Sequence, residues 1–204
     1  EMELLSPKEA QDLWPIMDIE DVYGAAFLPT DGQANPTDIS QALAKGARNK
    51  GAKIIEETKA IKVILEDGVI TGLETDKGVI NCEKIVCCCG QWTRQFAETV
   101  GVNVPLVSFQ HQYLVTEEID GVKSNLPTLR DPDRLIYFKE EVGGLVMGGY
   151  EPNPLSWAEK TVPEDFHFSL LDSDYDHFEL IMNNALGRVP LLETAGIKEL
   201  INGP

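Results

Sequence analysis

The sequence is poor in basic side chains: 17 lysines and arginines stand against 34 aspartates and glutamates, for a formal net charge of −17. This charge repels polyanions, so it argues against nucleic acid and against an anionic membrane surface as partners. No apolar run reaches the length of a membrane span, and no basic segment followed by an apolar one opens the chain. We expect an acidic, solvated surface; attraction of cationic amines is the weaker functional interpretation.

Cysteine is also scarce, and no CxxC pair occurs. The four cysteines are Cys82, Cys87, Cys88 and Cys89, of which three are consecutive. Neighbours in a strand point to opposite faces, so these thiols are poorly placed to share one metal ion. We predict buried, reduced thiols in a strand, no metal site and a reducing compartment: the cytoplasm, or the mitochondrial matrix in a eukaryote.

The 204 residues, 43% of them hydrophobic, are enough for one large domain or two small ones. No internal repeat or low-complexity tract is present. Helix-start signals with a cap followed by proline occur at Ser6 and at Asn35, and Gly51 is suited to end the second helix. The patterns predict helices over residues 6–14, 35–50, 92–100 and 177–188.

The pattern of predicted strands differs between the first and second halves of the chain. In the first half a glycine turn joins a helix to residues 53–56, and the apolar run 85–89 is typical of a strand covered on both faces, so we expect a parallel sheet. Asp67-Gly68 between apolar runs predicts a hairpin of residues 60–65 and 69–75, followed by a strand over 79–82. From residue 105 on, strands alternate with Pro- and Asp-rich loops, as in an antiparallel sheet; they are predicted over residues 112–116, 135–139 and 144–149.

Two strand-like segments, residues 109–113 and 135–140, each place one ionisable side chain in an apolar run. These side chains are His111 and Tyr137. Histidine exchanges a proton near neutral pH and tyrosine holds one in place, so a pair of them would suit acid–base work on a small molecule. The alternative is that both are buried residues satisfied by backbone groups.

Eight short strings in order resemble the FAD-dependent amine oxidoreductases of the D-amino-acid-oxidase superfamily, most of all the dimethylglycine and sarcosine dehydrogenase/oxidase branch. They occupy residues 30–36, 41–48, 89–92, 111–113, 126–131, 136–140, 148–151 and 201–204. The family begins with a GxGxxG turn for the FAD pyrophosphate and ends with a segment that contacts the flavin. Neither occurs here, so we expect an internal piece of a longer protein, inactive alone and unable to bind FAD tightly.

The resemblance implies a fold of mixed class, α/β plus α+β. A partial FAD-binding, Rossmann-like domain would comprise residues 32–102. An antiparallel-sheet substrate-binding domain would comprise residues 103–204, with residues 1–31 also belonging to it.

The resemblance also assigns roles to single residues. His111 and Tyr137 match the family's active-site pair. Arg130 would bind a substrate carboxylate, with a salt bridge to Asp131 or Asp133 as the open alternative, and Tyr150 is a second substrate-binding candidate.

For the nucleotide, the resemblance implies a backbone contact from Ile61 to the adenosine part. It places Cys89 and Gly90 near the diphosphate. His167 and His177 lie among acidic residues and are predicted at the surface.

The implied function is FAD-dependent oxidative demethylation of a small zwitterionic amine, dimethylglycine or sarcosine, by hydride transfer to the flavin. Several members of this branch carry a C-terminal folate-binding domain, so folate is an implied partner. Residues 176–179 and 191–194 are also similar to the regulatory subunit of pyruvate dehydrogenase phosphatase. A non-catalytic regulatory subunit is therefore the alternative, and oxidation of D-amino acids is a third.

Overall fold

The computed structural model describes all residues, 1–204, and divides them into two compact units. The first unit comprises Glu1–Gln33, Phe109–Leu155 and Ser169–Pro204, and the second comprises Ala34–Ser108 and Ser156–Phe168. The boundary near residue 33 lies close to the predicted one. Residues 103–108 and 156–168, which we predicted in the substrate-binding domain, belong to the second unit by their contacts. No helix is long and apolar enough to cross a membrane.

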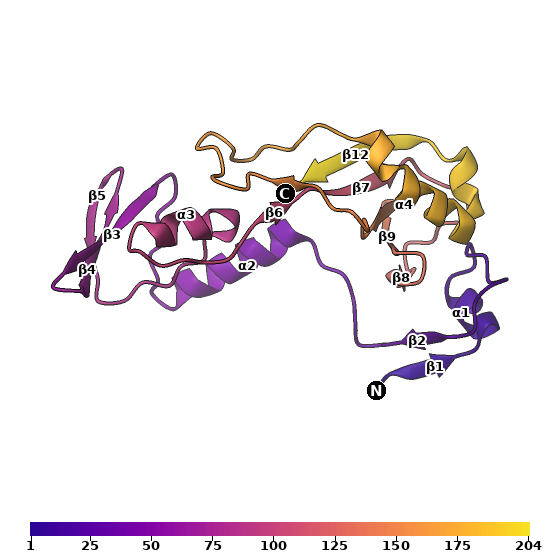
Figure 1. Cartoon of the computed structure of the whole chain (residues 1–204). Helices are drawn as coiled ribbons and strands as arrows, with labels where there is room; N and C mark the ends of the chain where they lie inside the picture. Colours follow the sequence, from indigo (N-terminus) through magenta and orange to yellow (C-terminus); the bar gives the residue numbers. More distant parts are fainter. The chain divides into compact units, whose positions relative to one another are not determined.

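The first unit is built on a five-stranded antiparallel sheet with strand order β12-β7-β10-β9-β8 (Figure 1). Its strands are β7 (His111–Thr116), β8 (Leu129–Asp131), β9 (Ile136–Glu141), β10 (Gly144–Gly149) and β12 (Ile197–Gly203). Strands β7 and β9 alternate between one buried face and one less buried face, as expected of a sheet that covers a core on one side, whereas the middle strand β10 is buried at every residue except Val146.

Helices cover the buried face of this sheet. Helix α4 (Tyr175–Arg188) packs Phe178 and Ile181 against it, and α1 (Pro7–Leu13) brings Trp14, which lies 5.6 Å from the Phe138 ring between centroids. The 3-10 helix η2 (Pro190–Thr194) follows α4, and β1 (Glu3–Leu5) pairs with β2 (Ala25–Phe27). The core of the unit therefore lies between the sheet and these helices.

Local signals account for most of these elements. The Ser6 hydroxyl accepts from the backbone N–H of Glu9, and the Glu9 carboxylate accepts from that of Ser6, so the predicted capping box is present. The Asn35 side chain caps α2 (Pro36–Asn49) in the second unit. Asp67 and Gly68 both have positive φ, at 50° and 79°, which forms the tight turn of the predicted hairpin.

The second unit contains that hairpin within a three-stranded antiparallel sheet of β3 (Ala60–Glu66), β4 (Val69–Thr75) and β5 (Gly78–Asn81). Helix α3 (Thr93–Glu98) follows the 3-10 helix η1 (Gly90–Trp92). The short strands β6 (Ser108–Phe109) and β11 (Ser156–Trp157) pair with each other.

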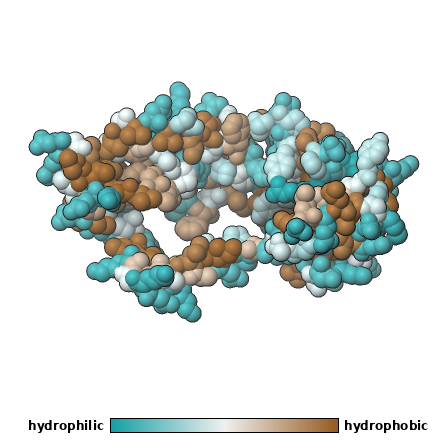
Figure 2. Space-filling view, turned by 90° about the horizontal axis from the view of Figure 1, so that it is seen from below, coloured by the Kyte–Doolittle hydropathy of each residue, from teal (hydrophilic) through white to brown (hydrophobic).

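The predicted strands at residues 53–56 and 85–89, and the parallel sheet built from them, are wrong for this structure: both segments lack strand pairing, and every register is antiparallel. An extended apolar segment becomes a strand only when a neighbour takes its backbone hydrogen bonds. Here Val86 is 85% exposed and Ile55 60%. Figure 2 shows brown, hydrophobic surface over the second unit, which is drawn on the left there as in Figure 1.

The cysteine prediction also needs correction. All four thiols are free, as expected, but none is in a strand, and Cys87 and Cys88 are exposed. The cause is the same: the segment that carries them has no partner strand to bury it.

Helix α4 provides a test of the core. Replacing Ile181, which is fully buried, with alanine leaves a cavity and should lower the free energy of unfolding by about 2–4 kcal/mol. The matched control is Leu180→Ala, since Leu180 precedes it on the same helix but is 49% exposed. Urea unfolding of both variants makes the comparison, and equal losses would contradict the packing described here.

Candidate functional site

The predicted site residues of the first unit lie on the face of the sheet opposite the core. Antiparallel pairing sets Gly148 of β10 opposite Tyr113 of β7 and opposite Tyr137 of β9. Arg130 of β8 is in turn opposite Tyr137. Directly opposed residues share a face, and so do residues two apart on a strand, which brings His111 to the same face.

Within this face His111 and Tyr137 meet directly. The distance from His111 Nε2 to the Tyr137 hydroxyl is 3.2 Å, within hydrogen-bond range. Tyr150, just beyond the end of β10, closes a cluster of three rings: its centroid lies 6.0 Å from that of His111 and 5.9 Å from that of Tyr137. Two candidate side chains from separate strand motifs are therefore in contact.

A glycine makes room for this contact. A Cβ atom at Gly148 would lie 2.3 Å from the Tyr137 hydroxyl and 2.4 Å from Cζ of its ring. Such distances are impossible, so the Tyr137 ring lies over the bare backbone of β10. The tyrosine side chain is thereby directed along the sheet toward His111.

The electrostatics keep Tyr137 protonated. Burial above all, together with the nearby Tyr150, Glu151 and Tyr113, raises the pKa of Tyr137 to about 12, while Arg130 acts in the opposite direction. At neutral pH the group is a phenol that can donate its proton in a hydrogen bond. Because His111 Nε2 is the atom within reach, the natural arrangement is donation from Tyr137 to an unprotonated Nε2.

Arg130 provides a cation at the edge of the cluster. Its guanidinium donates to the Tyr150 hydroxyl at 2.7 Å, and its Cζ lies 5.9 Å from the centre of the Tyr150 ring. Neither alternative salt bridge, to Asp131 or to Asp133, forms: the Asp131 carboxylate pairs with Arg188 at 2.8 Å, and adjacent residues of a strand point to opposite faces. The exposed Arg130 thus keeps donors available for an anionic group.

The predicted cofactor-binding residues belong to the second unit. Ile61 falls where the β3–β4 register shifts between Ala60 and Lys62, so it has no partner residue on β4. Gly90 has φ of +52°, and a Cβ there would meet nothing within 4 Å. Burial raises the pKa of the Cys89 thiol beside it, so that thiol stays neutral. Open backbone at Ile61 and Gly90 suits the predicted contacts to a nucleotide.

Sequence reasoning missed one residue of the site. Glu151 directly follows Tyr150, and its Oε2 lies 3.4 Å from His111 Nδ1. His177, predicted at the surface, is partly exposed, with its Nε2 atom buried. The only sequence signal for Glu151 was its position at the end of the string 148–151; His167 is exposed, as predicted.

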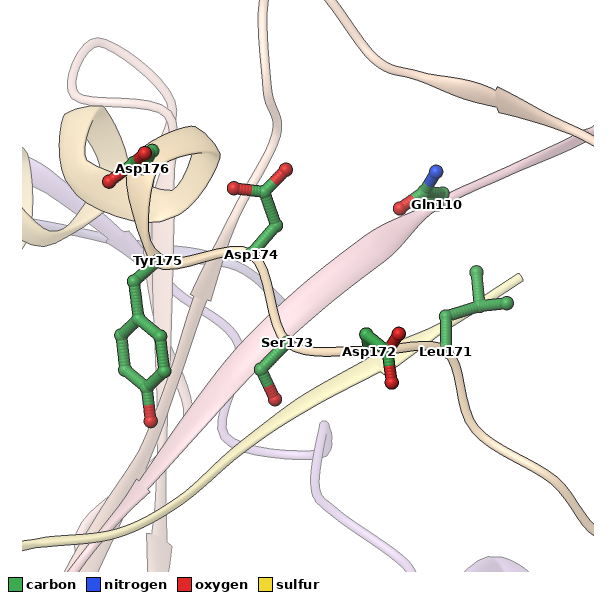
Figure 3. Close-up of a pocket in the computed structure, with 7 residues that line it drawn as sticks. All are labelled: Gln110, Leu171, Asp172, Ser173, Asp174, Tyr175 and Asp176. Atoms are coloured by element: carbon green, nitrogen blue, oxygen red, sulfur yellow. The ribbon is translucent and has the colours of Figure 1, made fainter.

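A hollow of about 530 Å³ lies at the start of α4, lined in part by Asp172, Asp174 and Asp176 (Figure 3). The Asp174 carboxylate is used to cap α4, accepting from the backbone N–H of His177. In Figure 3 the Tyr175 and Ser173 side chains point in the opposite direction from the Asp174 carboxylate. These side chains do not converge on a common point, so the hollow is a helix start rather than a second site.

The chain belongs to the family of FAD dependent oxidoreductases, whose family model matches residues 1–202. Membership confirms the family and the cofactor class that the motifs predicted.

Several individual proteins are similar to the chain. It is 39% identical to the mitochondrial sarcosine dehydrogenase of Homo sapiens over 209 residues, which is 100% of this chain and 22% of that protein. It is 32% identical to the mitochondrial dimethylglycine dehydrogenase of Homo sapiens, covering 100% of this chain and 24% of that one. It is 36% identical to the mitochondrial pyruvate dehydrogenase phosphatase regulatory subunit of Mus musculus, covering 99% and 23%.

The fold is shared with solved structures. L-proline dehydrogenase from P. horikoshii superposes with a TM-score of 0.84 at 24% identity, over 99% of this chain and 52% of that one. The chain spans less than a quarter of the length of the curated relatives named above and about half of this structure. Helices with antiparallel sheets agree with the α+β part of the predicted fold, and this arrangement is shared with that structure.

Gly148→Ala tests the geometry of the site. The new methyl group must displace the Tyr137 ring, so the contact between Tyr137 and His111 should be lost, visible in a crystal structure of the variant. Gly46→Ala is the control, because a Cβ there meets nothing within 4 Å and alanine favours its helix by about 0.5–1 kcal/mol. An unmoved Tyr137 in Gly148→Ala would refute the role given to this glycine.

Proposed function

We propose that the chain is part of an FAD-dependent oxidoreductase that oxidatively demethylates an N-methyl amino acid, sarcosine or dimethylglycine. The observation that carries this proposal is the hydrogen-bonded pair of His111 and Tyr137, with Arg130 on the same sheet face. Relatives named for sarcosine and dimethylglycine support the substrate class. For a eukaryotic protein, their mitochondrial names support a location in that organelle.

The flavin would supply the redox chemistry, by taking a hydride equivalent from the C–H bond next to the amine nitrogen. In this chain Ile61, Cys89 and Gly90 would contact it, at the one residue of β3 without a partner on β4 and at the open turn of Gly90. The remaining contacts to its diphosphate would come from parts of the protein outside this chain.

The residues of the first unit would prepare the amine. An ammonium group cannot release a hydride equivalent readily, so its N–H proton must first leave. Tyr137 can accept that proton on its oxygen while passing its own to His111 Nε2, which lies 3.2 Å away. The net result is a neutral amine and a protonated imidazole.

Arg130 would bind the carboxylate of the zwitterion. It has no carboxylate partner within the protein, whereas Asp131 beside it is occupied by Arg188. A guanidinium offers parallel donors that match a carboxylate, so it would orient the amine end of the substrate toward His111 and Tyr137.

The test uses the full-length protein that contains this chain, loaded with FAD. Under anaerobic conditions, sarcosine or dimethylglycine should bleach the visible absorbance of the flavin. His111→Ala and Tyr137→Phe should slow this bleaching about 10²-fold or more, because each interrupts the proton transfer.

The result that would overturn the proposal is flavin that stays bound and oxidised in the presence of both amines. It would favour a regulatory subunit without catalysis, an alternative supported by the 36% identity to the pyruvate dehydrogenase phosphatase regulatory subunit.

Substitution of Arg130 separates binding from chemistry. In Arg130→Met the dissociation constant for the amino acid, from the concentration dependence of bleaching, should rise about tenfold or more, through loss of a charge-assisted pair. Arg48→Met is the control, since Arg48 is a surface arginine paired with Glu56 in the other unit. Equal affinity of Arg130→Met and the unmodified protein would exclude Arg130 as the carboxylate ligand.

A further inference from the structure

Glu151 is a buried carboxylate at the rim of the site. Its side chain is only 5% exposed, in contrast to His111, whose side chain is 41% exposed. Burying a carboxylate is costly unless it is compensated by hydrogen bonds or charge, so its position demands a partner. Within ion-pair distance that partner is His111 Nδ1, 3.4 Å from Oε2.

The other oxygen of Glu151 faces a different environment. Oε1 is fully buried and has no hydrogen-bond partner in the protein. Glu151 also lines a cavity of about 200 Å³, whose wall includes His177, Asp176 and Ile181. His177 Nε2 is likewise buried without a partner. A cavity of this size has room for several water molecules, each needing about 30 Å³, and the buried Glu151 and His177 atoms are the polar groups available to bind them.

The position of Glu151 favours one tautomer of the His111 imidazole. A carboxylate only accepts hydrogen bonds, so Oε2 favours a proton on His111 Nδ1. A neutral imidazole with its proton on Nδ1 has an unprotonated Nε2. That nitrogen is the one that faces the Tyr137 hydroxyl, whose phenol remains protonated at neutral pH.

We propose that Glu151 is a positioning residue for His111: it holds the ring with the proton on Nδ1, leaves Nε2 ready to accept, and stabilises the imidazolium formed when a proton arrives. The carboxylate acts through the imidazole and touches neither substrate nor flavin. The transfer balances as one proton moved from the amine, through the Tyr137 hydroxyl, to Nε2, with Glu151 unchanged.

Other groups around His111 do not supply this function. Tyr113 lies on its own strand, Tyr137 and Tyr150 contribute phenols, and Arg130 contributes a positive charge. Arg130 would disfavour a second cation nearby. Glu151 is the one carboxylate within 4 Å of the imidazole, so it alone provides the compensating negative charge.

The inference rests on the proposed function where kinetics are concerned, so the test has two readouts. In the full-length flavoprotein, Glu151→Gln preserves the shape of the side chain but removes its charge. The rate constant of flavin reduction at saturating amine should fall about tenfold or more, with the substrate dissociation constant changed less than threefold. Glu151→Leu, which also removes the acceptor, should be at least as slow.

The matched control is Glu140→Gln. Glu140 is also buried, but its carboxylate accepts from the backbone N–H of Gly143 and has no contact with His111. This variant should reduce flavin at the unmodified rate. If Glu151→Leu fails to fold, Glu151→Gln decides the question, and a rate within twofold of the unmodified protein overturns the proposal.

The second readout is independent of catalysis. Nitrogen-15 NMR of histidine-labelled protein should report His111 with its proton on Nδ1, and this preference should be lost in Glu151→Leu. Should no amine reduce the flavin of the unmodified protein, the proposed function fails while these spectra still decide the role of Glu151. Identical His111 signals in both proteins would overturn it.

Discussion

The site depends on the missing side chain at Gly148. This residue lies on the middle strand of the five-stranded sheet, between Tyr113 and Tyr137 on its two neighbours. Any Cβ there would collide with the Tyr137 ring. The bare backbone therefore lets an aromatic ring lie across the sheet, and this direction brings its hydroxyl to His111 and its ring beside Tyr150. The same strand adds a second constraint. Leu145 and Met147, on its opposite face, are completely buried, and a register shift of one residue would expose them.

The sheet thus separates two tasks that often conflict. One face packs against α1 and α4 and contributes the stability of the unit, while the other carries polar rings, a guanidinium and a phenol with a raised pKa. Glu151 joins these two environments. It emerges just after the end of β10, is buried against a cavity shared with α4, and reaches His111 on the other side. A carboxylate held in this way is a fixed acceptor, and a fixed acceptor is what an acid–base histidine needs to keep one tautomer.

Sequence patterns predicted the elements whose signals are local. The capping box at Ser6, the Asn35 cap and the Asp67-Gly68 turn all involve residues a few positions apart, and all three are present. The strands predicted at residues 53–56 and 85–89 are wrong because strand formation depends on a neighbour that no local pattern can supply. The acidic neighbours of His177 along the chain indicated a surface position; the residue is only partly exposed, because it lines a cavity together with residues 151–153, which are distant in sequence.

By itself the sequence determined the family and the cofactor class, and it singled out His111 and Tyr137 as candidates, since these rest on residue types in a fixed order along the chain. Strand alternation was also readable, and it places His111 and Tyr137 on one face once the register is known. Only the tertiary structure decided that register, directed Arg130 to Tyr150 rather than to Asp131, and brought Glu151 to His111. The physical reason is that each of these contacts joins different strands or the segments beyond them, and their distances are set by sheet pairing and core packing.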